Sequence, residues 1–134
     1  MNPLLDIATY LETLAIGSLG GSDPTKTPIY ISNLPDDVDN GILIDSTAGN
    51  MPNQYYGLYH AQMEIWIRFK DTELGYSKAR AILTALNHKN NLSLASCYVY
   101  YIQPITDVEG LGRDNNNRSL HKLLVDLTYR EIIS

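Results

Sequence analysis

Residues 58–87 read LYHAQMEIWIRFKDTELGYSKARAILTALN, a strand pattern followed directly by a helix pattern. From Leu58 to Lys70 apolar residues occupy every second position, which is typical of a strand with one buried face. The alternating apolar residues are Tyr59, Ala61, Met63, Ile65, Ile67 and Phe69. From His60 to Lys70 the intervening positions are polar except for Trp66. We therefore predict a long strand over residues 58–70.

A helix is predicted directly after this strand. Asp71 is a natural N-cap, because its carboxylate can accept hydrogen bonds from the free amides of the first turn. The apolar positions that then follow helical spacing are Leu74, Ala79, Ile82, Leu83 and Leu86. Gly75 lowers the helix propensity by roughly 1 kcal/mol relative to alanine, and the sequence offers no reason for it. A helix with one apolar face packs on a sheet, so this strand and this helix together predict an α+β domain.

An earlier helix is predicted at the beginning of the chain. Asn2 suits the N-cap, and Pro3 suits the first helical position because it has no backbone N–H to lose. One face carries Leu4, Ile7, Ala8, Leu11, Leu14 and Ala15. Gly17 is placed to end this helix.

The remaining strands have weaker patterns. Residues 29–32 and 41–45 are short apolar runs separated by NLPDDVDN, which predicts a hairpin. Residues 92–106 predict a strand that ends near Pro104. Residues 119–133 fit both helical and strand spacing, and we assign them as a strand.

Three segments rich in turn-forming residues are predicted as loops, namely 17–28, 47–57 and 110–118. Such loops are where one protein often meets another. The candidate interface residues are Asn50, Asn53, Gln54, Tyr55, Tyr56, Arg113, Asp114, Asn116 and Arg118. Because the sequence has no repeat and no break in composition, we predict one domain over 1–134.

Composition and charge exclude several classes of protein. With 134 residues, 44% hydrophobic and 19% charged, the chain is expected to fold without crosslinks. A net charge of −5 argues against a surface that binds nucleic-acid phosphates. The single cysteine, Cys97, has no disulfide partner, and no apolar run approaches membrane-spanning length. The first residues, with Asp6 and Glu12, are unlike a secretory signal, so we expect a cytosolic protein.

No motif in the sequence predicts a catalytic or metal site. His60, His88 and His121 fall on different elements without metal-ligand spacing, so we expect no metal and no cofactor. Cys97 lies in a strand-like run that does not favour a thiolate. If an EF-hand calcium loop began at Asp36, the side chain at Val38 would have to supply an oxygen ligand, and valine has none. We therefore expect this acidic turn to be solvated and not to bind calcium.

The glycines and tyrosines also have ordinary explanations. A phosphate-binding loop needs glycines at a defined spacing just before a helix begins. The glycines at 17, 20, 21, 110 and 112 do not have this arrangement. The ten tyrosines could stack on bases, but a stacking platform requires a positive groove. Tyrosine is enriched in protein interfaces, and packing is the expected role here.

The order of these patterns resembles the tail terminator and minor capsid, or tail-completion, proteins of long-tailed bacteriophages. The likeness covers nearly the whole chain, beginning with MNPLLDIATYLETL. It continues with YHAQMEIWIRFKD, which leads into TELGYSKARAILTALN, and closes with GLGRDNNNRSLHKLLVDLTYRE. Gly112, Asp114, Arg118 and Tyr129 look similar to the loop and final strand of that family.

The resemblance implies an α+β fold, a mostly antiparallel sheet flanked by two helices, that assembles into a ring. The ring, usually a hexamer, would cap the head-proximal end of the tail tube, end tube polymerisation and join the tail to the head. The implied partners are other copies of this chain, the tail tube protein and a head-completion or connector protein. The implied location is the virion tail, after synthesis in the host cytoplasm, and no catalytic residue is implied.

Two other functions remain open from the sequence. A head-completion, or stopper, protein would bind the connector instead of the tube. A small enzyme or ligand-binding domain would need a site built from tyrosine, His60 and aspartate side chains, but no acid, base and nucleophile converge in the sequence.

Overall fold

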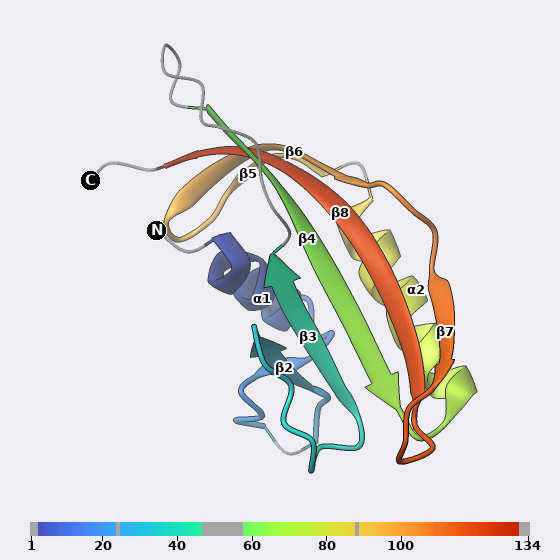
Figure 1. Cartoon of the computed structure of the whole chain (residues 1–134). Coiled ribbons are helices and arrows are strands. Elements are labelled where there is room, and N and C mark those ends of the chain that lie inside the picture. Colours follow the sequence, from blue (N-terminus) through green and yellow to red (C-terminus); the bar gives the residue numbers. More distant parts are fainter. Residues whose placement is uncertain (1–2, 24, 47–57, 88, 132–134) are drawn as a thin grey trace.

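The computed structural model of the chain describes residues 3–23, 25–46, 58–87 and 89–131 (Figure 1). In these ranges the helices are α1 (Pro3–Thr13) and α2 (Thr72–Leu86). The strands are β1 (Ser18–Leu19), β2 (Pro28–Ile31), β3 (Gly41–Ser46), β4 (Leu58–Phe69), β5 (Lys89–Ser93), β6 (Cys97–Pro104), β7 (Glu109–Arg113) and β8 (Ser119–Glu131). They form one sheet in the order β1-β2-β3-β4-β8-β6-β5, with β7 also paired to β8. The α+β class is confirmed.

The antiparallel pair β4 and β8 forms the middle of the sheet. Its register runs without interruption from Leu58 opposite Arg130 to Phe69 opposite Ser119. The long strand predicted after residue 57 is therefore confirmed, and the ambiguous segment 119–133 is a strand over 119–131. Alternate residues of β8 enter the core, whereas helical spacing would have placed Leu120 and Leu124 there as well.

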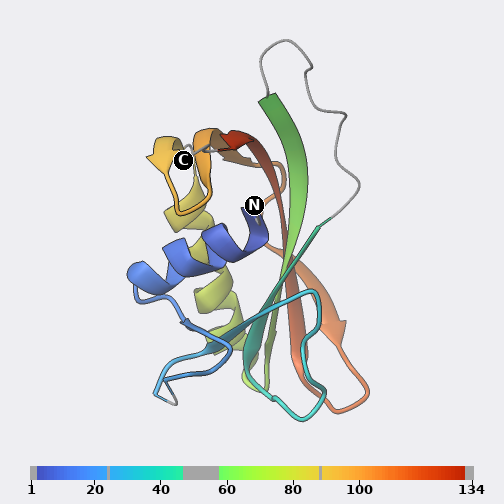
Figure 2. The same cartoon turned by 90° about the vertical axis from the view of Figure 1, so that its left-hand side faces the viewer.

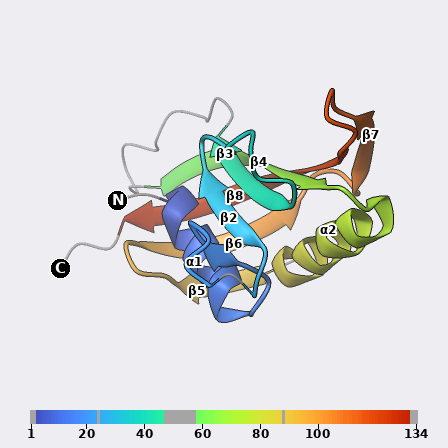
Figure 3. The same ribbon diagram turned by 90° about the horizontal axis from the view of Figure 1, so that it is seen from below.

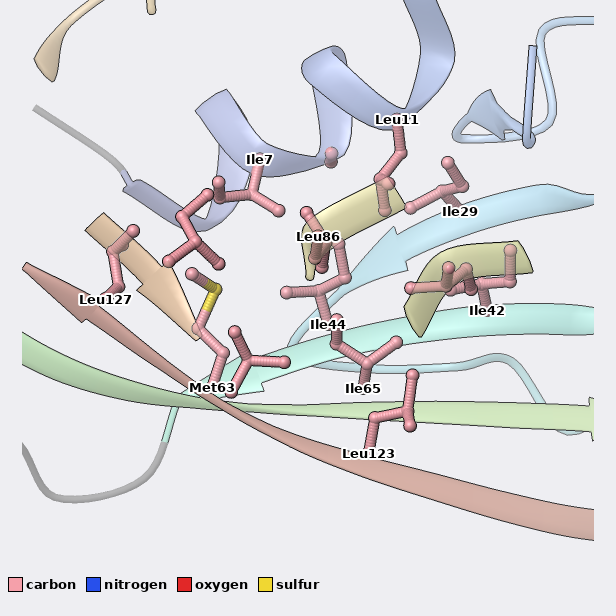
Figure 4. Close-up of a cluster of buried hydrophobic side chains, with 14 of the residues drawn as sticks. Ile7, Leu11, Ile29, Ile42, Ile44, Met63, Ile65, Leu86, Leu123 and Leu127 are labelled. Carbon is pink, nitrogen blue, oxygen red and sulfur yellow. The ribbon is translucent and has the colours of Figure 1, made fainter. Parts of the chain in front are cut away.

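Both helices lie on the same face of the sheet, which curls around them as a half-barrel (Figures 2 and 3). The core fills the space between the helices and this inner face (Figure 4). Its central side chains include Ile7, Leu11, Ile29, Ile42, Ile44, Met63, Ile65, Leu86, Leu123 and Leu127. Among the described residues no helix covers the outer face of the sheet.

The start of α2 confirms the predicted cap and explains Gly75. The Asp71 carboxylate accepts hydrogen bonds from the amides of Glu73, at 2.9 Å, and Leu74, at 3.3 Å. A Cβ on Gly75 would lie 3.2 Å from the Cβ of Phe69 and 3.3 Å from Nδ1 of His121. Glycine therefore lets the first turns of α2 approach the sheet closely. The prediction that Leu74 lies on the buried face is wrong, since it is 57% exposed.

Helix α1 packs through the predicted residues Ile7, Ala8 and Leu11, which are all buried. Leu14 is exposed instead, because the helix ends at Thr13 and Ala15 adopts a left-handed φ of 59°. The chain therefore changes direction at Ala15, two residues after the last residue of the helix.

A buried carboxylate joins α1 to the turn between β5 and β6. Asp6 accepts hydrogen bonds from the backbone amide and hydroxyl of Ser96, at 2.9 and 2.7 Å. The thiol of Cys97 lies 3.3 Å from the same oxygen. This contact links residues about 90 positions apart in the sequence.

The predicted hairpin between residues 29–32 and 41–45 is wrong, because β2 and β3 pair in parallel. The connection of residues 32–40 returns to the opposite end of the sheet before β3 begins, so both strands run in the same direction (Figure 1). β1 also pairs with β2 in parallel. The other five pairings are antiparallel, so in the described residues the sheet is mixed, though mostly antiparallel.

Other predicted boundaries also need correction. The segment predicted as one strand over 92–106 covers the end of β5, which begins at Lys89, and all of β6, and these two strands form a hairpin. The loop predicted over 17–28 contains β1, and residues 110–113 of the loop predicted over 110–118 belong to β7. Short strands at a sheet edge are specified by their neighbours, and their glycine-rich sequences have no strand pattern of their own.

Candidate assembly interface

The predicted interface residues fall into two groups. Asn50, Asn53, Gln54, Tyr55 and Tyr56 lie outside the described residues. The other four, Arg113, Asp114, Asn116 and Arg118, lie together at the end of β7 and in the turn that leads to β8. Whether any of these residues contacts another chain remains a prediction.

The turn between β7 and β8 is closed by Asp114. Its carboxylate accepts hydrogen bonds from the amides of Asn116 and Arg118, both at 3.0 Å. The amide of Asp114 donates to the carbonyl of Arg118 at 2.9 Å. The amide and guanidinium of Arg118 lower the pKa of Asp114, because both stabilise its charged form. Asn116 is exposed at this turn.

Arg118 fastens this turn to the connection between β2 and β3. Its side chain is only 2% exposed and lies 2.9 Å from carboxylate oxygens of both Asp114 and Asp36. It also donates to the carbonyls of Asp36, at 2.7 Å, and Val38, at 3.2 Å. Burial alone would lower the pKa of Arg118, but the bonds to Asp36 and Asp114 raise it above its ordinary value. The hydrogen-bond donors of this guanidinium therefore bind groups of the same chain.

Arg68 fixes the same connection from β4. Its guanidinium donates to the carbonyl of Pro35 at 2.6 Å and to that of Val38. The two arginines thus bind neighbouring carbonyls of one nine-residue connection, residues 32–40. Sequence reasoning missed this arrangement, because neither the distance along the chain nor the residue types identify the partners of Arg68 and Arg118.

The outer face of the sheet carries a second candidate surface. Trp66 on β4 lies beneath the amine of Lys122, 5.2 Å from the ring centre, and both side chains contact Glu64. Beside Trp66 is a groove of about 280 Å³. Its lining residues are Ser32, Asn33, Leu34, Leu43, Trp66, Arg68 and Leu120. The surface combines an apolar centre with charged neighbours, as protein interfaces do.

An aromatic cluster lies near the other end of the outer face. The rings of Tyr98 and Tyr100 meet edge to face with centres 5.0 Å apart. The guanidinium of Arg130 lies 5.1 Å from the Tyr98 ring centre and donates to the Tyr100 hydroxyl at 2.9 Å. Tyrosine and arginine are the residues that most often dominate binding energy in interfaces.

The histidines and Cys97 have local structural roles in the described part of the chain. His60 is exposed and bonds Thr128 at 3.0 Å, while His121 is buried beside Tyr76. His88 lies outside the described residues. Burial and the neighbouring Asp6 raise the pKa of Cys97 to about 12, so its thiol stays protonated. Among the described residues no three potential metal ligands come together.

No helix in the described ranges is both long and apolar enough to cross a bilayer.

Comparisons with known proteins point to one family. A family model described as bacteriophage tail terminator protein matches residues 10–130. A search of curated proteins gave no match. A chain from a solved structure described as the virion of a native gene transfer agent particle has 12% identity and a TM-score of 0.64. The alignment covers 97% of this chain and 96% of that one, and at this identity it shows a shared fold. A second solved chain is 15% identical with a TM-score of 0.47, too low to support an argument.

Proposed function

The chain belongs to the family of bacteriophage tail terminator proteins, and from this premise we propose that it caps the head-proximal end of a phage tail tube. In this role it forms a ring, expected to be a hexamer, that ends tube polymerisation and joins the tail to the head. The family match over residues 10–130 carries the proposal. The coarser statement, that this is a structural protein of a phage tail, follows from the family itself.

The sheet edges favour subunit contacts through loops and faces over one continuous sheet between copies. β1 has only two residues. β5 contains Asn91 with a left-handed φ of 56°, and β7 contains Gly112 with a φ of 82° and a shift of register. Short or irregular edge strands resist pairing with another chain. We therefore assign the contacts to the loops that carry the candidate interface residues and to the outer face.

The outer face supports the proposed assembly through its composition. This sheet face, which no described helix covers, carries a tryptophan, leucines and a tyrosine–arginine cluster, groups that gain binding energy when another protein excludes water from them. The groove beside Trp66 is large enough to accept a side chain from a neighbour. On the proposed model this face meets a second copy or the tail tube protein.

The acidic charge of the chain suits a ring through which DNA passes. Six copies would carry a net charge of about −30, since each contributes −5. Negative charge on a channel wall repels phosphate and disfavours binding of the passing DNA. No specific contact with DNA is therefore proposed.

The decisive experiment is electron microscopy of phage particles made without this protein. A terminator is required to stop tube growth, so tails of variable and excessive length are expected. Tails of normal length that fail to attach to heads would contradict the capping role and favour a head-completion protein. Pull-downs of the purified protein with tube and connector proteins test the same distinction, since a terminator retains the tube protein.

A further inference from the structure

A pocket is lined by residues of β7, of the beginning of α2 and of β8. Figure 3 shows β7 and α2 on the side of the molecule away from α1. The pocket has a volume of about 260 Å³. It is lined by Thr72, Gly110, Gly112, Arg113, Ser119, Leu120 and His121. A Cβ added at Gly110 or Gly112 would have no neighbour within 4 Å, so the glycines of β7 leave this space open.

Arg113 brings a positive charge to the pocket in a fixed position. Its guanidinium donates to the carbonyl of Asn117 at 2.6 Å, to the carbonyl of Lys70 at 3.3 Å and to the Thr72 hydroxyl at 2.7 Å. In the described part of the chain it has no carboxylate within 4.0 Å, unlike Arg118 in the adjacent turn. Because the Thr72 oxygen accepts from Arg113, the Thr72 hydroxyl proton remains available to another acceptor.

His121 forms part of the floor and is 5% exposed. Its Nδ1 atom is buried and has no hydrogen-bond partner among the described residues. Its neighbours include Tyr76 and Gly75 on α2, Ile67 on β4 and Gly110 on β7. Burial lowers the pKa of His121, so the ring is neutral at pH 7.

From these observations we propose that the pocket binds an oxyanion, held by Arg113 and the Thr72 hydroxyl above the His121 ring. A guanidinium pairs with carboxylate or phosphate through two parallel hydrogen bonds, and a partly enclosed pocket strengthens this attraction. The amides of Glu73 and Leu74 play no part, since Asp71 already accepts from them. The anion is either free inorganic phosphate or the carboxylate of a side chain from another protein.

The pKa of His121, followed by NMR of the histidine rings, reports occupancy of the pocket. Protein is titrated in sodium phosphate, in sodium acetate and in sodium chloride at the same ionic strength. A bound anion favours the protonated ring, so the pKa of His121 is expected to rise by roughly one unit relative to chloride. A response to phosphate alone identifies phosphate as the ligand, whereas a response to acetate identifies a carboxylate site.

Two variants test the assignment, and one serves as a control. Arg113→Gln removes the positive charge, and Gly110→Val adds a side chain at a lining residue where a Cβ would have no neighbour within 4 Å. Either change is expected to abolish the response to the anion. Arg80→Gln, which removes an exposed guanidinium paired with Asp107, should leave it unchanged.

The proposal is overturned if neither anion moves the His121 resonance, or if both pocket variants respond as the natural protein does. A well-dispersed amide spectrum of each variant ensures that loss of the response reflects the pocket and not unfolding. The result does not depend on the proposed terminator role, since it is measured on the isolated chain.

Discussion

Arg118 illustrates how a charged loop residue can be part of the interior of a protein. A guanidinium that is 2% exposed is tolerated because two carboxylates and two carbonyls satisfy its donors. Asp36 and Asp114 remain partly open to solvent, so the attraction is moderate at each of them. The main effect is structural, because the turn between β7 and β8 and the connection between β2 and β3 meet at this side chain.

Replacing Arg118 with methionine is expected to destabilise the protein by about 2 kcal/mol, because the carbonyl of Asp36 and the carboxylate of Asp114 lose the donors that the guanidinium supplies. The free energy of unfolding in urea measures this loss. As a control, Arg80→Met removes an exposed ion pair with Asp107 and should cost about 0.5 kcal/mol. Equal losses in the two variants would contradict the assigned role of Arg118.

His121 should make the stability depend on pH. An unfolded imidazole titrates near 6.5, whereas the buried ring of His121 has a lower pKa. As the pH falls below 6.5, the unfolded state therefore binds protons before the folded state does. The free energy of unfolding is expected to decrease from pH 6.5 down to the lowered pKa, with no contribution from this residue above about pH 7.5.

Urea unfolding at a series of pH values tests this expectation. His121→Leu should remove this part of the pH dependence, because leucine cannot be protonated. His60→Gln, at an exposed histidine, should retain it. A natural protein whose stability is flat between pH 7 and pH 5 would contradict the buried neutral state.

Among the secondary-structure elements, the strand and helix of residues 58–87 were predictable because their signals are local. Alternation specifies which face of β4 is buried, and Asp71 specifies where α2 begins. The parallel pairing of β2 and β3 was not predictable from Pro35 and the aspartates of the connection. Those residues favour a turn, whereas distant groups hold the connection in its path, among them Arg68 on β4 and Arg118 in the turn before β8.

Helix α1 is held at its start by a contact that its own sequence does not show. Asp6→Ala should destabilise the protein by about 2 kcal/mol, because the partly buried amide and hydroxyl of Ser96 lose their acceptor. Hydrogen exchange of the α1 amides should accelerate in this variant more than exchange in β4. Thr9→Ala, at an exposed position of the same helix, serves as the control. Unchanged exchange in α1 of Asp6→Ala would show that apolar packing alone holds the helix.

In the whole molecule, placing both helices on one face leaves the other face of the sheet for contacts (Figure 2). The inner face supplies the core and therefore the stability of the chain. The outer face contributes Trp66, the groove beside it and the cluster around Arg130. On the proposed function, this division allows the assembly surface on the outer face to change without altering the core.

Trp66→Ser is expected to prevent assembly while the isolated chain still folds. The side chain lies on the outer face, so its loss removes apolar contact area from the proposed interface and leaves the core intact. Tail length measured by electron microscopy in phage carrying this variant is expected to be irregular. Leu74→Ser removes a leucine that is 57% exposed on the helix side and should give normal tails. Normal tails with Trp66→Ser would exclude the outer face from the contact.

The sequence by itself determined the α+β class, the long central strand, the two helices and most of the residues that they bury, because periodicity and capping act over a few neighbouring residues. It also carried the resemblance that the family match supports. The tertiary structure alone decided the parallel strands, the interior place of Arg118 and the pocket at His121. These depend on contacts such as Arg118 with Asp36, 82 positions apart, and no local pattern encodes which distant groups will meet.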